Sequence, residues 1–96
     1  MLFVITAMDK PDSQKLRMAT RSAHFDYVHA TGMVKLGGPF LDEAGEMIGS
    51  LIIIEAADLA EAQRWQADDP YAQAGLFAHA ELRPWKATAN TCKAEL

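Results

Sequence analysis

Cysteine is almost missing from this sequence, which has a single one, Cys92, near its end. One cysteine excludes an internal disulfide and makes a cysteine-based zinc site or nucleophile improbable, so a reducing cytoplasm is the expected compartment. Long apolar runs are missing too, since none approaches the roughly 18 residues of a membrane span. The apolar start MLFVITAM has no basic lead, and it therefore predicts a first strand and not a signal peptide.

Basic residues are few and scattered, with 9 Lys and Arg against 13 Asp and Glu and a net charge of −4. No basic stripe or polybasic cluster forms, which argues against nucleic-acid or membrane partners. KLGGPF, residues 35–40, lacks the Gly-Lys-Ser/Thr signature of a phosphate-binding loop. His24 and His29 lie about 140° apart on a helix and cannot share a metal. We expect neither a cofactor nor a metal.

What the chain does have is enough apolar material for one modest core. It has 96 residues, of which 50% are hydrophobic and 23% charged, as in an ordinary globular domain. We place one domain at residues 1–88 and a short, partly mobile tail at 89–96.

Hydrophobic patterning and turn residues predict strands and helices in the order β-α-β-β-α-β. The strands are expected at residues 2–8, 33–42, 47–56 and 77–87, and the helices at 11–31 and about 59–67. The first helix should end at Gly32 and pack on the sheet through an arc about 80° wide. That arc contains Leu16, Ala19, Ala23, Tyr27 and Ala30, with Arg17, Arg21 and His24 on its flank.

This order predicts an α+β, ferredoxin-like fold with a four-stranded antiparallel sheet and both helices on one face. The first and third strands are apolar at both parities, so the other face of the sheet is apolar as well. Water would cover a large patch there in a monomer. We therefore expect a homodimer that joins the open sheet faces into a dimeric α/β-barrel.

An ordered set of residues resembles the YCII-related (YciI-like) family over residues 1 to about 86. The set comprises Asp9-Lys10-Pro11, then Arg21, His24 and Tyr27, GGP at 37–39, Gly45 and Gly49, DPYAQAGL at 69–76, and ELRPW at 81–85. The resemblance implies a dimeric α/β-barrel and a catalytic pair, which would be His24 and Asp69. The family includes a dehydrochlorinase of chlorinated hydroxyhydroquinone-type aromatics, although nothing in this chain indicates that substrate in particular.

The residues themselves leave two interpretations of this pair. Histidine titrates near neutrality and can accept and return a proton, but His24 could also be a boundary residue of an amphipathic helix. Asp69 before Pro70 is typical of a helix N-cap. One carboxylate oxygen can cap while the other orients an imidazole, so capping and catalysis are compatible. Its neighbour Asp68 is expected in solvent.

Other residues are candidates for substrate binding. Arg21 can hold a carboxylate or phenolate, or it can pair with Asp26 or Glu61 on the surface. Gly38 and Pro39 allow close approach of a ligand to the backbone, or they only form a bulge.

Two tyrosines complete the predicted site. The ring of Tyr27 lies on the core arc and is expected mainly to pack, while its hydroxyl can reach the pocket. Tyr71 is expected in the pocket wall or the core.

Two functions of different classes fit these observations. The first is a small-molecule enzyme that uses His24 and Asp69 for cofactor-free proton transfer, in an elimination or isomerisation of a small organic acid or ring compound. The second is a non-catalytic ligand-binding or accessory module that acts as a dimer. A pocket that both side chains face would favour the enzyme, whereas an Asp69 that points to solvent would favour the module.

Overall fold

The computed structural model describes all 96 residues and has four strands and three helices. The elements are β1 Leu2–Asp9, α1 Gln14–Thr31, β2 Val34–Leu41, β3 Met47–Glu55, α2 Leu59–Asp68, α3 Pro70–Gln73 and β4 Phe77–Trp85. The four strands and two long helices match the predicted order. α3 is a short extra turn between α2 and β4.

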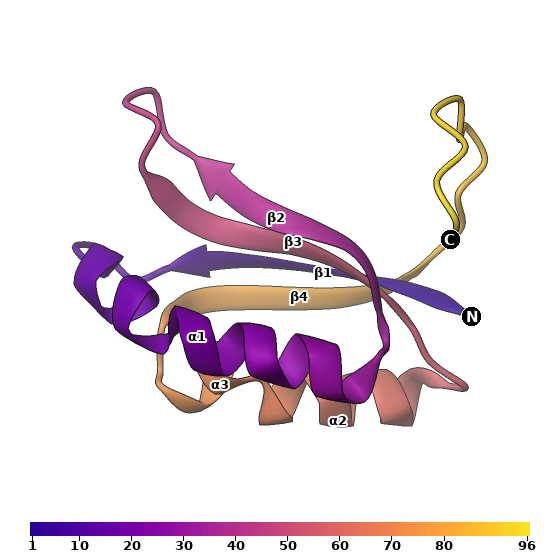
Figure 1. Ribbon diagram of the computed structural model, residues 1–96, viewed down its shortest axis with the longest axis horizontal. Helices are drawn as coiled ribbons and strands as arrows, with labels where there is room; N and C mark the ends of the chain where they lie inside the picture. Colours follow the sequence, from indigo (N-terminus) through magenta and orange to yellow (C-terminus); the bar gives the residue numbers. More distant parts are fainter.

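The strands form one antiparallel sheet in the order β2-β3-β1-β4. All three helices cover the same face of this sheet, as Figure 1 shows. This arrangement is the ferredoxin-like α+β fold expected from the element order. β2, with its Gly-Gly-Pro segment, is an edge strand, which agrees with the restriction of proline to edges and bulges. No helix is both long and apolar enough to cross a bilayer.

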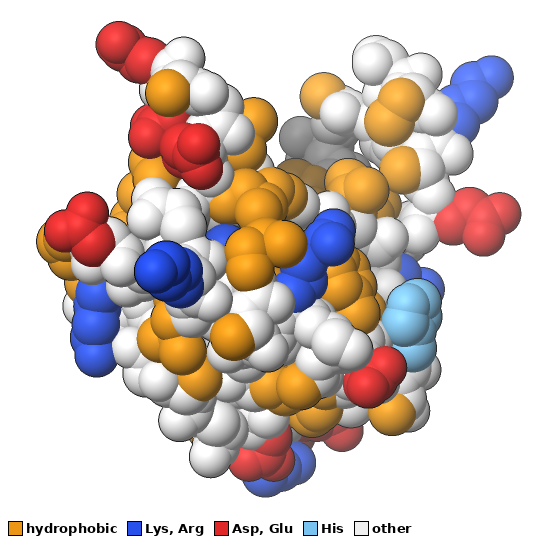
Figure 2. All heavy atoms as spheres, turned by 60° about the vertical axis from the view of Figure 1, so that its left-hand side comes forward, with side chains coloured by type: hydrophobic (Ala, Val, Ile, Leu, Met, Phe, Trp, Pro, Cys, Tyr) orange, Lys and Arg blue, Asp and Glu red, His pale blue; other side chains and the backbone are white.

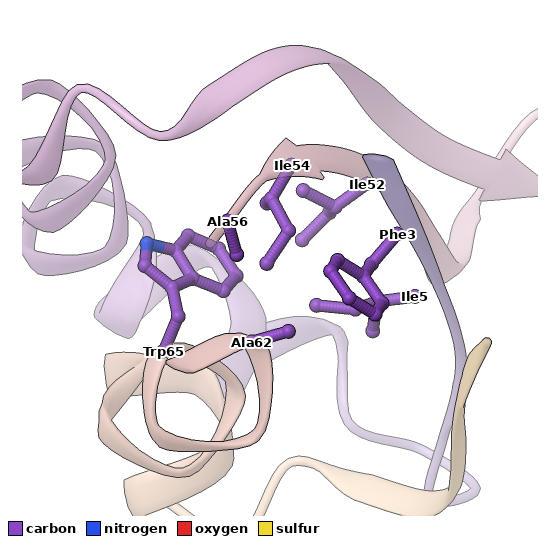
Figure 3. Close-up of a cluster of buried hydrophobic side chains, with 7 residues drawn as sticks. All are labelled: Phe3, Ile5, Ile52, Ile54, Ala56, Ala62 and Trp65. Atoms are coloured by element: carbon purple, nitrogen blue, oxygen red, sulfur yellow. The ribbon is translucent and has the colours of Figure 1, made fainter. Parts of the chain in front are cut away.

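The core lies between the sheet and α2. Alternate residues of a strand point to one face, so Phe3 and Ile5 of β1 and Ile52 and Ile54 of β3 all reach the helices. Figure 3 shows these side chains meeting Trp65 from α2. The cluster is completed by Ala56 and Ala62.

α1 begins three residues later than predicted and ends where predicted. Pro11 and Asp12 form a turn in which Asp12 has a φ of +57°, a value that a helix cannot contain. The helix therefore starts at Gln14, after Ser13. Gly32, with a φ of +63°, adopts the left-handed conformation that closes the helix.

The predicted packing face of α1 is wrong. Its buried residues are Arg17 and His24, with Tyr27 and Val28 partly buried, whereas Leu16 is 38% exposed. The alanines of the predicted arc, Ala19, Ala23 and Ala30, are exposed. Each buried polar side chain meets a buried carboxylate, which offsets its desolvation, so the helix turns its polar flank towards the sheet.

The sheet face opposite the helices has no element of this chain packed along it in Figure 1. The pairing register assigns Val4 and Thr6 of β1 to this face, with Leu51 and Ile53 of β3. In Figure 2, hydrophobic side chains occupy the hollow between two raised lobes of the surface.

Candidate active site

A cavity of about 130 Å³ opens between α1, the β2 and β3 strands, and the short helix α3. Polar side chains line one part of it and apolar side chains the rest. Its lining comprises Arg17, Arg21, His24, Phe25, Val28, Val34, Gly37, Gly38, Pro39, Met47, Ser50, Ile52 and Tyr71. Because α1 turns its polar flank inward, two guanidinium groups and an imidazole reach a cavity whose other walls are partly apolar.

His24 and Asp69 meet beside this cavity, although 45 residues separate them in sequence. His24 Nδ1 lies 2.7 Å from Asp69 Oδ1, and the two residues are 7% and 3% exposed. An ionised carboxylate only accepts hydrogen bonds, so Nδ1 is the donor and neutral His24 keeps its lone pair on Nε2. Nε2 makes no hydrogen bond within the chain, although no fully buried polar side-chain atom lacks a partner. It is therefore open to a ligand.

The sequence around Asp69 explains how the carboxylate is held. Asp69 ends α2, and Pro70 occupies the first turn of α3, where its missing N–H is not needed. Asp69 Oδ1 accepts the Tyr71 backbone N–H at 3.0 Å as a helix cap. We expected one carboxylate oxygen to cap the helix and the other to contact the imidazole. This was wrong in one detail, since the capping oxygen Oδ1 also accepts from His24. Asp69 points to a buried partner and not to solvent.

Tyr71 holds the imidazole from one side. Its ring stacks on His24 with centroids 4.1 Å apart and planes 17° from parallel. Phe25 meets His24 edge-on at 5.5 Å. Such aromatic contacts, with the Asp69 hydrogen bond, leave the imidazole little freedom to turn.

Arg17 is a site residue that the sequence analysis did not assign. Its Nε and Nη2 lie 2.7 and 2.9 Å from the two oxygens of Asp9, and Nη2 also donates to Ser50 Oγ at 2.8 Å. Its Cζ lies 4.8 Å from the centroid of the Tyr71 ring. The available signal was Asp9, an acidic residue at the end of an apolar strand, eight residues before an arginine.

Burial alone would lower the pKa of the Arg17 guanidinium, but the hydrogen bonds and charge of Asp9 outweigh burial and raise it. Arg17 is therefore cationic at every accessible pH. Burial also raises the pKa of the Tyr71 phenol, against the opposing charges of Arg17 and Arg21. Tyr71 therefore stays a neutral hydroxyl at neutral pH.

Most of the predicted binding residues come together here. Arg21, Gly38, Pro39 and Tyr71 all line the cavity with His24. Tyr27 does not line it, because its hydroxyl donates to the Trp65 carbonyl oxygen at 2.8 Å.

The surface alternative for Arg21 is not observed, since it forms no ion pair and its guanidinium lies 5.0 Å from the centre of the Phe25 ring. Asp68 is exposed, as expected. No group of three or more His, Cys, Asp or Glu side chains is arranged to hold a metal ion.

Comparison with known proteins matches residues 1–86 to the model of the YCII-related domain. Protein YciI from Escherichia coli O6:H1 is 37% identical over 95 residues, covering 90% of this chain and 97% of that protein. An uncharacterized protein from Haemophilus influenzae is 33% identical over 96 residues, with the same coverage of each chain.

Among solved structures, a similar one is 5-chloro-2-hydroxyhydroquinone dehydrochlorinase (TftG) from Burkholderia phenoliruptrix, in complex with 2,5-dihydroxybenzoquinone. It superposes with a TM-score of 0.81 at 34% identity, covering 90% of this chain and 94% of that one.

Proposed function

The chain belongs to the YCII-related family, and from that premise we propose that it is a small-molecule enzyme in which His24, oriented by Asp69, transfers a proton without a cofactor. The reaction class is an elimination or isomerisation of a small organic acid or ring compound. The observation on which this proposal depends is the buried 2.7 Å contact between His24 Nδ1 and Asp69 beside an accessible cavity.

The chemistry follows from the tautomer. With Nδ1–H donated to Asp69, Nε2 is the base, and the carboxylate stabilises the imidazolium that forms when Nε2 takes a proton. In an elimination, the electron pair of the broken bond to hydrogen forms a double bond and expels the leaving group. In an isomerisation, the same pair shifts along a conjugated system and the imidazolium returns the proton at another atom.

The dehydrochlorinase from Burkholderia phenoliruptrix supports this class of reaction. By its name it removes the elements of hydrogen chloride, and it was solved with a six-membered ring compound. The cavity of the present chain, at about 130 Å³, is close to the roughly 150 Å³ of an apolar protein cavity that accepts benzene. The identity of 34% favours a shared type of chemistry more than a shared substrate.

The dyad is tested by NMR of protein with ¹⁵N-labelled histidine. We expect neutral His24 to be protonated on Nδ1, and Asp69→Asn to weaken this preference, because an amide is a poorer acceptor than a carboxylate. His29, exposed on the same helix, is the internal reference. Protonation of neutral His24 on Nε2 in the wild type would contradict the proposal.

Turnover is tested with 5-chloro-2-hydroxyhydroquinone and with unchlorinated hydroxyquinones in deuterated water, following chloride release and loss of ring protons. His24→Gln should slow either process by about 10²- to 10⁴-fold, the usual contribution of a general base. His29→Gln, the same change on the exposed face, should have no effect. If wild type and His24→Gln bind these compounds equally and react equally slowly, the chain is a binding module instead.

A further inference from the structure

Arg17 has one nitrogen, Nη1, that neither Asp9 nor Ser50 engages. Those two residues take Nε and Nη2, and the Tyr71 phenol interacts with the same guanidinium. Arg17 as a whole is only 3% exposed. No polar side-chain atom that is completely buried lacks a hydrogen-bond partner, so an unbonded Nη1 must have some exposed surface. Since Arg17 lines the cavity, Nη1 is a donor open to that space. The bidentate pair with Asp9 fixes the guanidinium plane and hence the direction of this donor.

A second guanidinium stands beside it. Arg21 follows Arg17 by four residues, so the two side chains are neighbours on one helix face. Arg21 also lines the cavity and pairs with no carboxylate. No Asp or Glu is among the lining residues. The cavity near these two side chains therefore presents the unpaired positive charge of Arg21 and the hydrogen-bond donors of both guanidinium groups, with the charge of Arg17 balanced by Asp9 behind it.

The remaining wall is largely apolar. Val28, Val34 and Ile52 form part of it, and the side-chain-free Gly38 narrows it little. His24 lies two helical turns from Arg17, about 10 Å along the axis, and both side chains contact the Tyr71 ring. A small ring or short conjugated chain can therefore reach from the donors to His24.

We propose that this cavity binds a small conjugated organic anion, a carboxylate or phenolate, whose charged oxygen lies on Arg17 Nη1 and Arg21. The role of His24 as the base at the other end of this molecule rests on the proposed function. Proton removal by Nε2 adds negative charge to a conjugated system, and the two guanidinium groups are placed to stabilise that charge at the oxygen. Arg17 is then a binding residue and not only a tie between α1 and the sheet.

The charge preference is tested with pairs of equal shape, acetate against acetamide and benzoate against benzamide, titrated into the ¹⁵N-labelled protein. We expect each anion to bind at least about tenfold more tightly than its amide, with shifts centred on Arg17 and Arg21. Arg17→Lys keeps the charge opposite Asp9 but removes the free donor. It should abolish most of the anion's advantage and leave amide binding little changed.

Two further variants keep the test decisive. Arg21→Gln alters an exposed residue and should reduce anion affinity severalfold even if Arg17→Lys does not fold. Arg64→Lys, on the exposed surface of α2, is the matched control and should change nothing. Equal affinities for anion and amide in both pairs overturn the inference, as does an anion preference that survives both Arg17→Lys and Arg21→Gln.

Failure here is distinct from failure of the proposed function. His24→Gln should lose proton transfer and keep the anion preference, because the cations are untouched. An active enzyme without anion preference would overturn only this inference. An anion preference in a protein without the His24–Asp69 tautomer would leave a binding site and no acid/base enzyme.

Discussion

Tyr27 combines a core contact with an ionisable group. Its ring lies 5.2 Å from that of Trp65, and its hydroxyl donates to the Trp65 carbonyl oxygen. Burial, with the charges of Asp68 and Asp69, raises the pKa of the Tyr27 phenol from 10.0 to about 12. The folded protein therefore holds this proton more tightly than the unfolded chain. Its contribution to stability is complete below about pH 10 and is lost as the pH rises towards 12.

Denaturant unfolding measured between neutral pH and about pH 12 checks this expectation. The free energy of unfolding should fall over the alkaline range in the wild type and fall less steeply in Tyr27→Phe. Part of the fall should remain, because burial also raises the pKa of Tyr71. At neutral pH Tyr27→Phe should cost about 1 kcal/mol for the lost hydrogen bond. Equal alkaline slopes in the two proteins would show that Tyr27 is not responsible.

Single residues differ in how far the sequence predicts their role. Asp69 could be predicted as a cap because Asp-Pro is a local signal, and its contact with His24 was suggested by the family pattern. The Arg17–Asp9–Ser50 network could not, because Ser50 joins it from β3 across 33 residues. A contact of that kind depends on sheet register, which no local pattern gives.

At the scale of elements, α2 has a cap that can be tested by itself. Asp58 accepts the Glu61 backbone N–H at 2.8 Å, and Glu61 in turn accepts the Ala57 N–H. Asp58 and Glu61, three residues apart, thus form a capping box, a pattern that can be recognised in the sequence. α2 supplies Trp65 to the core and ends at Asp69, so its stability bears on both the core and the site.

Asp58→Ala should lower the free energy of unfolding by about 1 kcal/mol, because a free N–H group at the start of the helix loses its side-chain acceptor. Denaturant unfolding measures this loss. Asp68→Ala is the matched control, since it removes an exposed carboxylate from the last turn of the same helix, where negative charge is unfavourable. It should be neutral or slightly stabilising. A loss of equal size in both variants would point to general charge effects instead of the cap.

The ends of α1 were predicted to within three residues, whereas its packing face was not predicted. The glycine signal at Gly32 acts locally, and it was correct. The packing face depends on which side chains find partners across the fold. Alanines contribute little apolar area, so the paired side chains of Arg17 and His24 decide the rotation of the helix. The polar flank of a weakly amphipathic helix was thus the signal for the site.

For the molecule as a whole, the open sheet face is the one along which no helix or strand of this chain packs in Figure 1. On this face Leu36 of β2 joins Leu51 and Ile53 of β3 and Val4 of β1 by register. Leu36 is 53% exposed. β4 contributes charged side chains instead, with Arg83 paired to Glu81. An apolar surface with a charged border on one side is typical of an interface between proteins.

We propose that a second copy of the chain covers this face, with the two sheets packed against each other. Sedimentation should then give twice the 10.5 kDa mass of the chain, and the melting temperature should rise with protein concentration. Leu51→Glu places a charge in the middle of the face and should produce monomers, because its burial would cost more than the contact gains.

Leu59→Glu is the matched control for this charge. Leu59 is 45% exposed and begins α2 on the helical side, where an acidic residue is favourable. This variant should stay dimeric. A wild type that sediments as a monomer at all concentrations would contradict the proposal, and a dimeric Leu51→Glu would place the interface elsewhere. Because the His24 cavity opens on the helical side of β3, dissociation by Leu51→Glu also shows whether proton transfer requires the dimer.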